Sequence, residues 1–97
     1  MIVTKKNLSE CVDYVYHQDI LKMILKDVDD INKNLEKMGH KDKQICLNYY
    51  SKDNTYNFTY KHNNGKISVN WELYTLDEIS SITEFMKDFT DDFVEED

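Results

Sequence analysis

The apolar residues of this sequence change their spacing twice, and these changes set the order of its secondary structure. In residues 8–38 they recur every three or four positions, which gathers them on one face of an α-helix. In residues 45–74 they alternate with polar residues, the pattern of an antiparallel sheet covered on one face. Helical spacing returns in residues 76–93. We therefore expect an α+β fold built from a helix, three strands and a helix.

The first helix is expected to begin near Asn7, because Asn7 and Glu10 have the spacing of a capping box. Gly39 is expected to end it, since glycine readily adopts the left-handed conformation that closes many helices. The apolar stripe changes phase at residues 17–19, which allows a kink or break there. Its members are Leu8, Val12, Val15, Leu21, Ile24, Val28, Ile31, Leu35 and Met38.

The three strands are expected to pair as an antiparallel meander. Short polar segments at 51–54 and 63–66 link them, and the pair Asn64 and Gly65 is a strong hairpin signal. The apolar face of this sheet is expected to consist of Ile45, Leu47, Tyr49, Tyr56, Phe58, Tyr60, Ile67, Val69, Trp71 and Leu73.

The second helix is expected to start at Thr75, which forms a full capping box with Glu78. Acidic residues crowd its C-terminal turns, where they oppose the helix dipole, so we expect residues 94–97 to fray. Both helices would cover the apolar face of the sheet in a two-layer sandwich and leave the polar strand face open. The expected centre of the core is Trp71, Phe58, Leu47, Ile24, Val28, Ile79 and Phe89.

Residues 1–97 are expected to form one domain without a catalytic site. Two glycines cannot build the known phosphate-binding loops, and the three histidines share no metal-ligand spacing. Asp13 and His17 are expected to be a solvated helix pair, and Cys11 and Cys46 small buried residues. We therefore expect a protein that is not an enzyme and that needs no metal or other cofactor.

The basic residues and the hydropathy indicate where the protein acts. All twelve basic residues are lysines, and the abundant residue types have AT-rich codons, which suggests a low-GC bacterium or its phage. The absence of arginine argues against sequence-specific reading of nucleic acid. No stretch approaches the roughly 20 apolar residues of a membrane span, and the first residues contain no apolar run of signal-peptide length. We expect a cytoplasmic protein, in the host cell if a phage encodes it.

The acidic charge is concentrated in the second helix and the residues after it. The chain has a net charge of -7, and residues 75–97 contain nine acidic residues and one lysine. Such a surface repels a phosphate backbone and attracts a basic protein. The candidate partner-binding residues are Asp88, Asp91, Asp92, Glu95 and Glu96, extended by Asp27, Asp29 and Asp30 of the first helix. The alternatives are a solvated terminus and, for the first helix, an exposed face paired with Lys26 and Lys33.

In size, acidic charge and element order, the chain resembles small acidic phage inhibitors, in particular one type II-A anti-CRISPR family. That resemblance implies a DNA mimic that occupies the PAM-reading cleft of the effector nuclease, and it assigns no role to any single residue here. Double-stranded-RNA-binding domains have the same element order. They need lysines where this second helix starts, and residues 75–78 are acidic instead, so we reject that function.

The leading hypothesis is therefore a small acidic protein that binds and inhibits a basic, nucleic-acid-handling protein. One alternative is a homodimeric structural or adaptor module, because the spacing of apolar residues 21–38 resembles a coiled-coil seam. A second is an immunity protein or antitoxin for a basic toxin. A third candidate surface is the open strand face with Tyr50, Tyr74, Asn48, Asn57 and Asn70, where aromatic rings could stack on bases.

Overall fold

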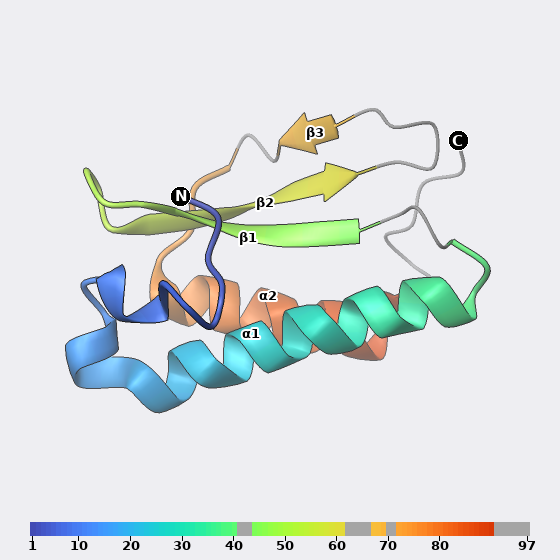
Figure 1. Ribbon diagram of the computed structural model, residues 1–97, viewed down its shortest axis with the longest axis horizontal. Helices are drawn as coiled ribbons and strands as arrows, with labels where there is room; N and C mark the ends of the chain where they lie inside the picture. The colour runs from blue at the N-terminus through green and yellow to red at the C-terminus, as the bar shows by residue number, and fades with distance from the viewer. Residues whose placement is uncertain (41–43, 62–66, 70–71, 91–97) are drawn as a thin grey trace.

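The computed structural model describes residues 1–40, 44–61, 67–69 and 72–90, and it confirms the expected element order (Figure 1). A short 3-10 helix, η1, precedes the first α-helix. Both α-helices lie on the same side of one three-stranded antiparallel sheet, α1 against β1 and α2 against β2. The elements are η1 (Leu8–Glu10), α1 (Tyr14–Lys37), β1 (Gln44–Tyr50), β2 (Thr55–Lys61), β3 (Ile67–Val69) and α2 (Leu76–Asp88).

The core forms between the helices and the two longer strands, as the apolar spacing predicts. Among the expected core residues, Leu47, Phe58, Ile24, Val28 and Ile79 are all buried. The prediction for Phe89 is wrong, because this residue follows the last turn of α2 and its side chain is 49% exposed. Trp71 lies outside the described residues.

The N-terminal segment extends the sheet at the outer edge of β1. The Val3 amide donates to the Leu47 carbonyl at 2.8 Å, and the Tyr49 amide donates to the Met1 carbonyl at 2.8 Å. This pairing covers part of an edge that would otherwise present free main-chain groups. It requires contact between residues more than forty positions apart, so local sequence patterns give no sign of it.

The predicted start of the first helix near Asn7 is wrong. The Asn7 side chain holds the N-terminal loop instead, accepting from the Thr4 amide and donating to the Ile2 carbonyl, each at 2.7 Å. The continuous helix begins only at Tyr14, and Val12 and Val15 are exposed. The expected break is present, because His17 leaves the helical region with φ of -136° and ψ of 38°.

The third strand presents the opposite face from the one predicted. Val69 pairs with Thr59 and Ile67 pairs with Lys61, and directly opposed residues in a sheet point to the same side. Ile67 and Val69 therefore lie on the face turned away from the helices, and Ile67 is 67% exposed. Alternation shows that a strand has two different faces but not which one is inward. The hairpin predicted at Asn64 and Gly65 lies outside the described residues.

Polar contacts fasten the start of α1 to the turn between β1 and β2. The Tyr56 hydroxyl donates to Asp13 Oδ2 at 2.6 Å, and Asn54 Nδ2 donates to Asp13 Oδ1 at 3.3 Å. The expected solvated pair of Asp13 and His17 is therefore wrong.

Cys11 is buried as expected, and burial first, then the charge of Asp13, raises the pKa of its thiol to about 11. Cys46 is half-buried.

The start of α2 is confirmed as a capping box. The Glu78 amide donates to Thr75 Oγ1 at 3.4 Å, and the Thr75 amide donates to Glu78 Oε1 at 3.1 Å. Immediately before it, Tyr74 exchanges two main-chain hydrogen bonds of 2.8 Å with Tyr56, which fixes the helix to the central strand. The expected fraying of residues 94–97 lies outside the described part of the chain.

Candidate functional site

The outward face of α2 is acidic along its length. Asp77, Glu84 and Asp88 are exposed, and their intervals of seven and four residues place them on one stripe of the helix. The stripe spans about 16 Å at 1.5 Å per residue. Asp77 and Glu84 belong to the acidic surface of residues 77–97 that the sequence predicts, but neither is among the individual residues expected to bind a partner. Their helical spacing could have shown that they share a face with Asp88. The many acidic residues after Asp88 instead placed the predicted contacts at the C-terminus.

The single lysine of α2 does not neutralise this stripe, because it is drawn toward α1. Lys87 Nζ lies 3.3 Å from Asp27 Oδ1, and the Asp27 residue is only 4% exposed. A hydrogen bond from Lys87 to Asp27 is the main cause that raises the pKa of Lys87. The Asp27 charge adds to it, followed by the charges of Asp88 and Asp30. Four charged side chains from two helices therefore gather at one place.

The structure places the predicted acidic residues in three different settings. Asp27 joins the two helices, because it forms an ion pair with Lys87 of α2 rather than with Lys26 of its own helix. Asp29 forms an exposed ion pair with Lys33 at 3.0 Å, as expected if this part of the first helix is an exposed face paired with lysines. Asp88 is exposed at the end of α2, and Asp30 is partly buried. The remaining predicted residues, Asp91, Asp92, Glu95 and Glu96, lie outside the described residues.

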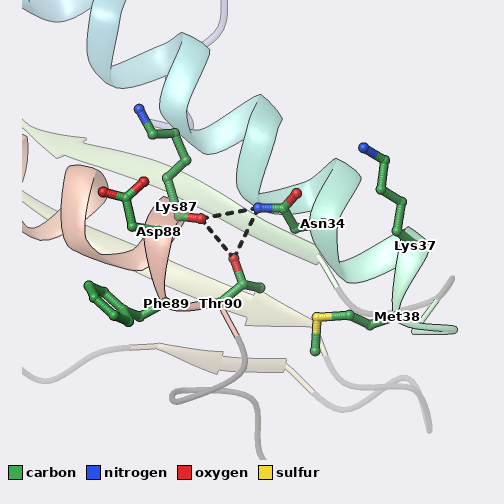
Figure 2. Close-up of a pocket in the computed structure, with 7 residues that line it drawn as sticks. All are labelled: Asn34, Lys37, Met38, Lys87, Asp88, Phe89 and Thr90. Atoms are coloured by element: carbon green, nitrogen blue, oxygen red, sulfur yellow. Dashed lines mark hydrogen bonds between the residues drawn. The ribbon is translucent and has the colours of Figure 1, made fainter.

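A cleft of about 320 Å³ lies where the C-terminal ends of α1 and α2 meet (Figure 2). Asn34 of α1 joins the two ends, because its Nδ2 donates to the Lys87 carbonyl at 3.1 Å and to Thr90 Oγ1 at 3.2 Å. Thr90 Oγ1 in turn donates to the Met86 carbonyl at 2.9 Å. The lining residues are Asn34, Lys37, Met38, Lys87, Asp88, Phe89 and Thr90.

Two phenylalanines are exposed beside the acidic stripe. Phe85 and Phe89 have exposed fractions of 56% and 49%, and their ring centroids are 4.8 Å apart with an interplanar angle of 31°. Met38, on the other side of the cleft, is also exposed. The sequence assigned Phe89 to the core because it continues the apolar stripe of α2. That stripe is wider than the face of the helix that the sheet and α1 can cover.

The open strand face offers little for stacking bases. Asn48 and Asn57 are buried, and Asn48 Nδ2 donates to Asn57 Oδ1 at 3.0 Å and to Thr59 Oγ1 at 2.7 Å. Tyr74 packs against the core on the helix side. Tyr50 is exposed, and Asn70 lies outside the described residues. These positions therefore do not favour the single-strand-binding alternative.

Comparisons with protein-family models, with curated proteins and with solved structures found no match. Within the described ranges, no group of three or more histidine, cysteine or acidic side chains could hold a metal ion. The helices of the described chain are too short or too polar to cross a membrane. We therefore base the functional proposal on the acidic face of α2 and the cleft at its end.

Proposed function

We propose that this protein binds a basic, nucleic-acid-handling protein and inhibits it by occupying the groove that receives nucleic acid. It would act by binding alone, without catalysis. The observation that carries the proposal is the exposed stripe of Asp77, Glu84 and Asp88, whose neighbouring Lys87 is committed to Asp27. Acidic side chains on one helical face attract a basic surface and steer its approach.

The spacing of the stripe supports mimicry of a nucleic-acid backbone. Glu84 and Asp88 are about 6 Å apart along the helix axis. Alternate phosphates of one DNA strand are separated by about 7 Å along the duplex axis. Together with the resemblance in size, charge and element order, this spacing makes the effector nuclease of a type II-A CRISPR system our first candidate target. The protein would then be encoded by a phage and act in the cytoplasm of the host cell.

The adaptor alternative loses its main support in the structure. The seam that resembled a coiled coil consists largely of residues buried in the chain's own core: Leu21, Ile24, Val28, Ile31 and Leu35. An adaptor would have to use the exposed residues Val15, Tyr16 and Met23 near the kink instead. An immunity protein for a basic toxin would use the same acidic face, and the identity of the partner separates it from an inhibitor of a nuclease.

A capture experiment with charge-reversed protein tests the proposal. Immobilised protein is exposed to lysate of a low-GC bacterial host, eluted with rising salt and analysed by mass spectrometry. We expect a basic nucleic-acid-binding protein to elute at moderate salt, because screening weakens contacts between exposed charges. Reversal of Asp88, Asp91 and Asp92 to lysine should abolish capture, whereas Asp53→Lys, in the distant β1–β2 turn, should not. Equal capture by the triple variant would refute the proposal.

A further inference from the structure

The cleft between the ends of α1 and α2 has features suited to a positive charge, although Lys37 and Lys87 also line it. Both helices end there, and the C-terminus of a helix carries a partial negative charge. The Asp88 carboxylate lines the cleft. Figure 2 shows the ammonium groups of Lys37 and Lys87 directed away from Asn34 and Thr90.

Part of the wall of the same cleft is apolar. Phe89 and Met38 lie on opposite sides of Thr90 (Figure 2), and Phe85 stacks on the Phe89 ring. Lysine and arginine side chains have long aliphatic stems that bury well against apolar surface while their charged ends reach acceptors. A phenylalanine ring also attracts a cation placed over its face. The arrangement therefore fits a cationic side chain better than a free inorganic cation.

The size and charge of the site restrict its occupant. A volume of about 320 Å³ is several times the roughly 30 Å³ that a water molecule occupies in the liquid. The Asp88 carboxylate and the partial negative charge at the two helix C-termini disfavour the phosphates of a nucleic acid. A second copy is disfavoured because each molecule has a net charge of -7, and like-charged copies repel one another. A basic protein is the occupant that matches both the Asp88 carboxylate and the apolar part of the wall.

We propose that this cleft receives a lysine or arginine side chain of a basic partner protein, with the Phe85 and Phe89 pair as the apolar contact beside it. The inference rests on the proposed function and adds to it the place where a basic side chain of the partner binds. Exposed aromatic residues commonly carry most of the energy of an interface, while the surrounding charges guide association. Binding then depends on apolar contact as well as on charge.

Three synthetic peptides of equal length separate these contributions. The first places lysines and leucines at helical spacing, the second replaces the leucines by serines, and the third is the first with acetylated lysines. The isotope-labelled full chain is titrated with each peptide and followed by nuclear magnetic resonance. We expect the lysine–leucine peptide to bind about tenfold more tightly than the lysine–serine peptide, shifting residues 34–38 and 85–90. The acetylated peptide should not bind.

Matched variants assign the effect to the cleft. Phe85→Ser should remove most of the tenfold preference for the lysine–leucine peptide and leave the affinity for the lysine–serine peptide unchanged. Asp88→Asn should weaken both lysine peptides about threefold to tenfold. Asp53→Asn makes the same change in charge in the turn between β1 and β2, a segment at the opposite end of the molecule from the cleft (Figure 1), and should have no effect. The dispersion of the spectra verifies that each variant is folded.

The possible results distinguish the two proposals. Equal affinity for both lysine peptides would overturn the apolar anchor and leave the acidic function standing. Absence of binding by either lysine peptide would overturn both. Self-association of the free protein through residues 85–90, detected by sedimentation and by the same resonances, would make a second copy the occupant and overturn the assignment to a basic partner.

Discussion

At the scale of single residues, the Asp13 carboxylate ties the start of the first helix to β2 and to the turn before it. It accepts hydrogen bonds from Tyr56 and Asn54, and the Tyr49 hydroxyl donates to Asn54 Oδ1 at 2.9 Å. Asn54 has a positive φ of 52°, a conformation that asparagine adopts more readily than most residues. Burial is the main cause that raises the pKa of Tyr56, and its hydrogen bond to Asp13 adds to it. The hydroxyl therefore stays protonated and donates at every ordinary pH.

Removal of this hydroxyl tests the contribution of the network. Tyr56→Phe keeps the buried ring but leaves Asp13 with a weaker set of donors, so we expect the free energy of unfolding to fall by about 1–2 kcal/mol. Urea denaturation measures it. Tyr50→Phe removes a hydroxyl from an exposed side chain and should change stability little. If both variants were as stable as the parent, the hydrogen bond to Asp13 would make no net contribution.

At the scale of elements, the second helix was predictable because its signals are local. Thr75 and Glu78 are three residues apart, and the hydrogen bonds of a capping box need no other part of the chain. The first helix shows the limit of such signals. Asn7 and Glu10 have the same spacing, but the Asn7 side chain bonds to the preceding loop. A cap is therefore foreseeable only where no tertiary contact competes for its side chain.

The cap of α2 gives a prediction with a definite dependence on pH. Hydrogen bonds from the Thr75 main chain and then its side chain lower the pKa of Glu78. A lowered folded-state pKa means that this contribution is present above the unfolded value, about 4.3, and is lost as the pH falls through the folded value. Thr75→Ala should lower the urea concentration at the midpoint of unfolding at pH 6, and should lower it less at pH 3.5. An equal decrease at both pH values would contradict the role of Glu78.

The inward face of a strand could likewise be predicted only where the local pattern was sufficient. Leu47 and Phe58 were placed correctly in the core, because β1 and β2 both carry their apolar residues on alternate positions facing the helices. Ile67 and Val69 alternate just as clearly, yet the register with Lys61 and Thr59 turns them outward. The register depends on the turn and on pairing across the sheet. Alternation alone does not contain that information.

At the scale of the whole molecule, the helices that build the core also build the candidate site. Their buried faces hold them against the sheet, and their packing brings Asp27 and Asp30 of α1 together with Asp88 of α2 around Lys87. The sequence predicted an acidic surface from the charge of residues 75–97. It could not predict that Asp27 would be buried and paired with a lysine of the other helix. Nor could it predict that Phe85 and Phe89 would remain exposed. Both outcomes depend on how α1 and α2 pack against each other.

The most direct test of the central claim is competition with nucleic acid. The basic protein identified by capture is purified, and its binding of fluorescent duplex or guide-bound target DNA is measured by anisotropy as this protein is added. We predict that the parent protein releases the DNA at stoichiometric amounts and that the Asp77, Glu84 and Asp88 to lysine variant does not. Unchanged DNA binding at saturating amounts of the parent protein would contradict the account, because the acidic face would then contact the partner away from its nucleic-acid groove.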